Sequence, residues 1–150
     1  MGYFTVKDQD CVFRIVTGRE YGRSRCLPFG NPDTLIEMTL DRDTDKIIDI
    51  ECIYLGGVFH EPALKLPDRR SNPEVRAYHT ACCYEDTPRS RLPCMVNLTR
   101  DELTLIFSSD PEAKLCVADE RVEYYYSDKF DLLYIKVVDL TAEEYAFLNR

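Results

Sequence analysis

The stretch that most constrains the fold runs from Val122 to Leu140 (VEYYYSDKFDLLYIKVVDL), because it joins two strand patterns through a turn. Val122–Tyr126 alternates with the period of two that is typical of a strand with one buried face. Ser127–Lys129 has the composition of a turn. The run Leu132–Val138 is apolar on both faces, interrupted only by Lys136. A strand of that kind is covered on both sides, so we expect it in the centre of its sheet.

The end of this stretch predicts a helix. Leu140–Glu144 (LTAEE) contains the S/T-x-x-E capping box that begins helices. The same box recurs at Thr99–Glu102 (TRDE) and predicts a short helix from Leu103, although its β-branched residues also suit a strand. Val96–Glu102 and Val138–Glu144 share the pattern V-[N/D]-L-T-x-[D/E]-E. Either a shared way of capping a helix or an internal duplication explains this match.

The remaining patterns are those of strands and loops. We expect a hairpin over residues 3–16, strands over 34–40, 47–59, 77–84, 94–98 and 113–118, and loops over 18–33, 60–76 and 85–93. The predicted fold class is therefore α+β, mostly antiparallel β-sheet with one or two short helices toward the C-terminus. At 150 residues, one globular domain spanning 1–150 is expected.

Charge is unevenly placed along the chain. The net charge is −8, and residues 101–150 hold 12 acidic against 5 basic side chains, a net of −7. This argues against nucleic-acid binding through a basic face, and suits either a basic partner or solubility alone. No apolar run has the length of a membrane span, and the N-terminus lacks the pattern of a secretory signal. The seven cysteines are scattered, so a cytoplasmic protein with free thiols is expected.

No motif predicts a metal, a cofactor or a catalytic residue. The Asp41-x-Asp43-x-Asp45 triplet begins like a calcium loop, but Lys46 and Cys52 stand where such a loop needs Gly and Glu, which favours an acidic turn. Zinc ligands could be drawn from His79, Cys82, Cys83 and Cys94. However, the chain has no C-x-x-C pair, and adjacent cysteines do not easily bind one tetrahedral metal. A nucleophilic Cys–His pair could use only His60 or His79, and no nucleophile turn accompanies a cysteine.

The arginines allow an alternative function. Arg19 and Arg23 lie in the first predicted loop, and Arg69 and Arg70 lie in the second. Together they could hold an anion in a small enzyme or ligand-binding domain, with His60 or His79 within reach. Solvated loops on different sides of the molecule explain them equally well.

The acidic C-terminal third suggests a protein-binding surface. Its carboxylates could gather with a tyrosine around the 122–126 strand and form an acidic-aromatic face for a basic partner. The residues predicted to make this contact are Glu120, Glu123, Tyr125, Asp128 and Asp131.

Two segments resemble those of bacterial toxin-immunity proteins. Thr39–Ile47 (TLDRDTDKI) is similar to a hairpin found in many of them, and Leu140–Glu144 (LTAEE) is similar to their C-terminal helix start. The resemblance implies a small cytosolic α+β protein that is not an enzyme and that occludes a cognate, basic toxin domain. A structural subunit of a larger complex is a further interpretation, which an exposed apolar patch would support.

Overall fold

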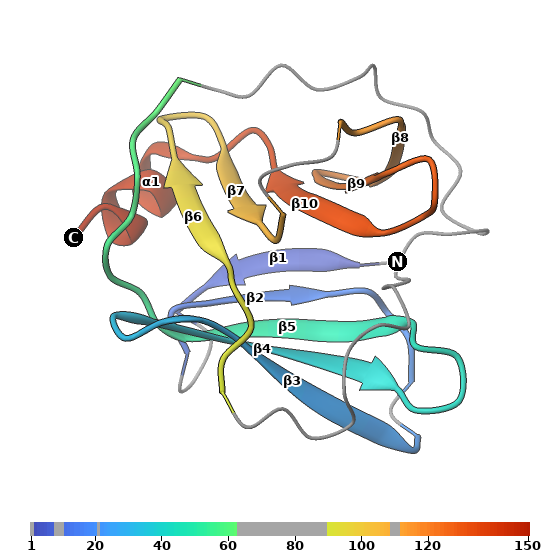
Figure 1. Cartoon of the computed structure of the whole chain (residues 1–150). Helices are drawn as coiled ribbons and strands as arrows, with labels where there is room; N and C mark the ends of the chain where they lie inside the picture. The colour runs from blue at the N-terminus through green and yellow to red at the C-terminus, as the bar shows by residue number, and fades with distance from the viewer. Residues whose placement is uncertain (1, 8–10, 21, 63–89, 109–111) are drawn as a thin grey trace.

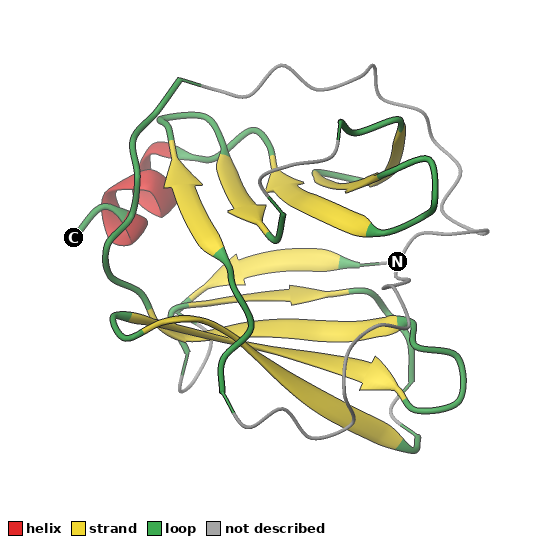
Figure 2. Cartoon of the chain, viewed as in Figure 1, coloured by secondary structure: helices red, strands yellow, loops and turns green. Residues whose placement is uncertain are grey.

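The computed structural model describes residues 2–7, 11–20, 22–62, 90–108 and 112–150. They form two five-stranded antiparallel sheets and one short helix (Figures 1 and 2). The N-terminal sheet contains β1 (Tyr3–Val6), β2 (Phe13–Val16), β3 (Ser24–Asn31), β4 (Thr34–Asp41) and β5 (Ile47–Tyr54). The C-terminal sheet contains β6 (Met95–Leu98), β7 (Leu103–Ile106), β8 (Leu115–Asp119), β9 (Val122–Tyr126) and β10 (Leu132–Val137). The helix is α1 (Ala142–Leu148).

The two sheets share one hydrophobic core. Alternation along β4 turns Ile36, Met38 and Leu40 inward, and each is fully buried. Tyr124 and Tyr126 of β9 do the same in the other sheet and belong to the same cluster of buried residues. Apolar burial on this scale is the main favourable term in folding. The inner faces of both sheets therefore stabilise each other.

The two sheets also have the same topology. The strand order is β1-β2-β5-β4-β3 in one and β6-β7-β10-β9-β8 in the other, with every neighbouring pair antiparallel. Two of the four connections also have equal lengths, because β3–β4 and β8–β9 are joined by two residues and β4–β5 and β9–β10 by five. Each strand of one half therefore has a counterpart five places further along the element order.

The residue register confirms that the halves correspond. Glu37 faces Glu51 across β4 and β5, as Glu123 faces Lys136 across β9 and β10. A bulge interrupts both pairs at the same place, with Ile48 of β5 and Leu133 of β10 as the skipped residues, each 1% exposed. Bulges bend a strand and are specific features of a fold. Three corresponding pairs are identical, namely Cys26 and Cys116, Glu37 and Glu123, and Ile50 and Ile135.

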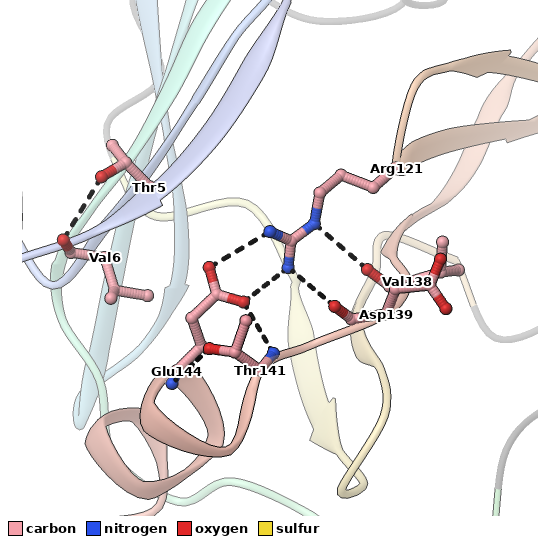
Figure 3. A network of polar contacts seen from close by, with 7 residues as sticks. All are labelled: Thr5, Val6, Arg121, Val138, Asp139, Thr141 and Glu144. Atoms are coloured by element: carbon pink, nitrogen blue, oxygen red, sulfur yellow. Dashed lines mark hydrogen bonds and ion pairs between the residues drawn. The ribbon is translucent and has the colours of Figure 1, made fainter.

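Helix α1 begins at the predicted capping box. The hydroxyl of Thr141 accepts a hydrogen bond from the backbone N–H of Glu144, and the Glu144 carboxylate accepts one from the N–H of Thr141. Arg121, in the β8–β9 turn, donates to both carboxylate oxygens of Glu144 at 2.6 and 3.2 Å (Figure 3). Its guanidinium also donates to the carbonyls of Val138 and Asp139. One arginine thus fixes the helix start to the turn.

Several sequence predictions are confirmed. The apolar run after the turn is β10, which lies in the centre of its sheet. The hairpin over 3–16 and the strands over 34–40, 94–98 and 113–118 are present as β1 and β2, β4, β6 and β8. The predicted fold class holds as mostly antiparallel sheet with a single short helix.

Three sequence predictions differ from the structure. Residues 103–106 form strand β7 and not a helix, because the Thr99 hydroxyl that accepts from the Glu102 N–H closes a turn between two paired strands. The stretch predicted as a loop over 18–33 contains β3, which pairs with β4 along its whole length. The predicted 47–59 strand ends at Tyr54. The strand expected over 77–84 lies outside the described residues.

Among the described residues, no helix has the length and apolar character needed to cross a membrane.

Candidate functional site

Two residues of the predicted acidic-aromatic face are buried. Glu123 and Tyr125 point away from the shared core, yet only 7% and 3% of them is exposed. The phenol of Tyr125 donates a hydrogen bond of 2.7 Å to the Glu123 carboxylate. Burial, together with this bond, raises the pKa of Tyr125 above its ordinary value. Neither side chain is available to a partner, which corrects the prediction that they form an exposed face.

The other three predicted contacts do not gather in one place. Glu120 is exposed in the β8–β9 turn, and Asp128 is exposed in the β9–β10 turn. The five residues of β9 separate these turns by roughly 17 Å. Asp131 is half-buried next to the second turn, where its carbonyl accepts from the Ser127 N–H. Glu120 therefore lies at one end of β9, and Asp128 and Asp131 lie at the other.

Arg19 and Arg23, the two described arginines of the predicted anion site, are not brought together. Arg23 is exposed and lies 3.7 Å from the Asp43 carboxylate. The backbone N–H of Arg19 donates to the Thr17 hydroxyl, at the end of β2. Neither arginine lines a pocket found among the described residues. The other members of that prediction, Arg69, Arg70 and His79, lie outside the described residues.

His60 lies in a segment that covers the free edge of β6. The Asn97 side chain accepts from the Glu61 N–H at 2.8 Å and donates to the Glu61 carbonyl at 3.1 Å. His60 Nδ1 lies 3.0 Å from the Leu98 carbonyl. A shallow pocket of about 500 Å³ lies beside this histidine, and one of about 260 Å³ lies beside Phe59. These contacts explain the segment as protection of a sheet edge.

The acidic triplet is a turn. Asp41 Oδ1 accepts from the Asp43 N–H at 2.9 Å, and Asp45 Oδ1 is bound by Arg25 at 2.9 Å. Within the described ranges, no three His, Cys, Asp or Glu side chains are placed to hold a metal ion. Cys94, directly before β6, is buried, and His79, Cys82 and Cys83 lie outside these ranges.

A charged surface occurs instead on the outer side of the N-terminal sheet. We call it the carboxylate face and define it by Arg14 of β2, Glu37 of β4, and Asp49 and Glu51 of β5. Glu37 and Glu51 stand directly opposite each other, and Arg14 stands opposite Glu51 on its other side. Arg14 lies 3.0 Å from Asp49 and 3.5 Å from Glu51. Three carboxylates and one guanidinium are thus placed on neighbouring strands.

The carboxylate face is partly open to solvent. The side chains of Arg14 and Glu51 are 26% and 37% exposed, and Glu37 is half-buried. Asp49 is buried, and its Oδ1 has no hydrogen-bond partner within the described part of the chain. Tyr3, which is 50% exposed, lies at the edge of the same side of the sheet. The face therefore combines negative charge with an accessible aromatic ring, as protein-binding surfaces often do.

The pKa of the Cys26 thiol is affected by the negative charge of this face. Its thiol donates to the Glu37 carboxylate at 3.2 Å. Partial burial, this hydrogen bond and the negative charges of Glu37 and Glu51 raise the pKa of Cys26 to about 12. The carboxylates thus disfavour any further negative charge beside them.

Sequence reasoning missed this face although its signal was present. The alternation of 34–40 and 47–54 places Glu37, Asp49 and Glu51 away from the core. The bulge at Ile48 decides which of these residues become neighbours, and a bulge has no reliable sequence signature.

A comparison of the chain with protein-family models finds no match, and a search of the curated proteins finds none either.

Proposed function

We propose that this chain is a non-enzymatic binding protein of the toxin-immunity type, which neutralises a basic toxin domain by covering it. The observation that carries the proposal is the partly exposed carboxylate face, in a molecule whose net charge is −8. A negative surface steers a basic partner toward it and raises the association rate.

The resemblance to immunity proteins supports the same proposal. Leu140–Glu144, which carries part of that resemblance, forms the capped start of α1. The hairpin at Thr39–Ile47 joins β4 to β5 and so connects the strands that bear Glu37 and Glu51. The hairpin that resembles immunity proteins therefore joins two of the strands that form the carboxylate face.

Co-expression with the product of the adjacent gene tests this function. If that product is a toxin, its expression alone should arrest growth, and co-expression of this chain should restore it. The two purified proteins should also elute as one complex of fixed stoichiometry. If the adjacent product arrests growth and this chain neither binds it nor restores growth, the proposal is wrong.

A further inference from the structure

The correspondence between the two sheets allows one outer face to be compared with the other. Across the N-terminal sheet, one row of outward positions reads Thr5, Arg14, Glu51, Glu37 and Pro28. The corresponding row of the C-terminal sheet reads Asn97, Thr104, Lys136, Glu123 and Ala118. The two rows occupy the same place in the same topology, so they can be compared position by position.

The C-terminal row is buried and balanced in charge. All five of its residues are at most 9% exposed. Glu123 faces Lys136, which is an opposite-charge pair, and the Lys136 ammonium lies 3.2 Å from the Glu102 carboxylate. Buried charges persist when they are paired. The charged residues of this row therefore have opposite charges of the same chain beside them.

The N-terminal row places like charges opposite each other. Where the C-terminal sheet has Glu123 and Lys136, the N-terminal sheet has Glu37 and Glu51. Like charges at directly opposed positions destabilise a sheet. Arg14 is shared between Asp49 and Glu51, and Glu37 has the Cys26 thiol, a weak donor, as its hydrogen-bond partner. A guanidinium placed between Glu37 and Glu51 would face both carboxylates.

The size and surroundings of the face suit a protein. Strands β3, β4 and β5 have eight residues each and extend over roughly 25 Å, β1 and β2 have four residues each, and five strands spaced about 4.8 Å apart give a width of roughly 20 Å. The resulting area of at most roughly 500 Å² is below the roughly 800 Å² that each partner buries in a standard interface, and it suits a short protein segment. Half-buried Leu35, Ile53 and Val16 flank the charges and provide apolar contact.

We propose that the carboxylate face is the docking surface for an arginine-bearing segment of a protein partner, with a guanidinium placed between Glu37 and Glu51. Arginine fits this position because its planar group donates to two carboxylates at once. The inference rests on the proposed binding function, and it names the surface and the chemistry of its partner.

A titration with a hexa-arginine peptide tests the surface without using a toxin. Amide chemical shifts of the labelled protein are followed at about 50 mM salt, where screening of surface charge is weak. We expect saturable shifts concentrated on β2, β4 and β5. Hexa-lysine should bind several-fold more weakly, because an ammonium cannot form the two-pronged contact.

Two charge reversals make the test specific. Glu37→Lys should weaken hexa-arginine binding at least tenfold, whereas Asp128→Lys, which changes the net charge equally in an exposed turn, should leave it within twofold. Unchanged cross-peaks distant from residue 37 would show that Glu37→Lys is folded, and Glu37→Gln is the second variant if it is not. Equal loss in both reversals, shifts centred on the β9 turns, or no saturable binding would overturn the inference. The co-expression result would be untouched by any of these outcomes.

Discussion

At the scale of single residues, Glu37 sets the electrostatic character of the carboxylate face. It faces Glu51 across the sheet and accepts the Cys26 thiol hydrogen bond. Its counterpart Glu123 has the same residue type and the same register, yet it lies in a buried row opposite a lysine. The same side chain therefore serves packing in one half of the molecule and exposes charge in the other.

Cys26 provides a chemical readout of this charge. Thiolate is the reactive form, so a pKa of about 12 instead of 9.0 should slow alkylation roughly a thousandfold at neutral pH, although Cys26 is exposed. Glu37→Gln should speed the reaction about tenfold or more by removing the charge and weakening the hydrogen bond. Site-resolved mass spectrometry after iodoacetamide labelling measures both rates. A Cys26 that reacts as fast as an unperturbed thiol would contradict the account of the face.

At the scale of secondary-structure elements, the capped start of α1 connects distant parts of the chain. Glu144 completes the capping box and receives Arg121, whose guanidinium also lies 5.4 Å from the ring of Phe4 in the other sheet. Partial burial opposes ionisation, but the hydrogen bonds and charge of Arg121 and the Thr141 cap together lower the pKa of Glu144. The helix start therefore contributes a stability that depends on pH.

Glu144→Gln should destabilise the protein by about 1 kcal/mol at pH 7, through loss of the ion pair with Arg121. The folded chain holds fewer protons on Glu144 than the unfolded chain does. Its contribution is therefore complete above the ordinary pKa of 4.5 and is lost as the pH falls through the lower folded-state pKa. Urea unfolding of both proteins at pH 7 and pH 3 measures this. A difference that persists undiminished at pH 3 would argue against the ion pair as its cause.

A strand or helix could be predicted from the sequence where a single local pattern determines its type. Alternation identified β4 and β9, and the capping box identified α1. The box at Thr99 was misleading, because the same hydrogen bond closes a β-turn when the next residues find a strand to pair with, and Leu103–Ile106 pairs with both β6 and β10. The position of the carboxylate face depended on strand register, which only the assembled sheet determines.

At the scale of the whole molecule, two sheets of identical topology enclose one core. Ile50 and Ile135 occupy corresponding central positions, and both are fully buried in the cluster that joins the sheets. The sequence pattern V-[N/D]-L-T-x-[D/E]-E does not mark this correspondence, since it relates β6 to β10, whereas the structure relates β6 to β1. The repeated architecture is visible in register and connection length, and sequence identity between the halves is sparse.

A shared core predicts that the chain unfolds as one unit. Ile50→Ala and Ile135→Ala should each cost about 2–5 kcal/mol, the usual range for removing a buried isoleucine side chain. Because the core is common, each variant should lower the midpoint of a single calorimetric transition. Two separated transitions, with each variant affecting only its own half, would show instead that the sheets are independent domains.

Binding of the adjacent gene's product to the Glu37→Lys variant tests the central claim most directly. Titration calorimetry should show at least a tenfold loss of affinity relative to the unaltered chain. Thermal stability should stay equal or rise by about 1–4 °C, because the introduced lysine then faces Glu51 as Lys136 faces Glu123. Asp128→Lys should bind like the unaltered chain. Full affinity in Glu37→Lys, with loss in Asp128→Lys, would contradict the assignment of the carboxylate face and favour the β9 turns.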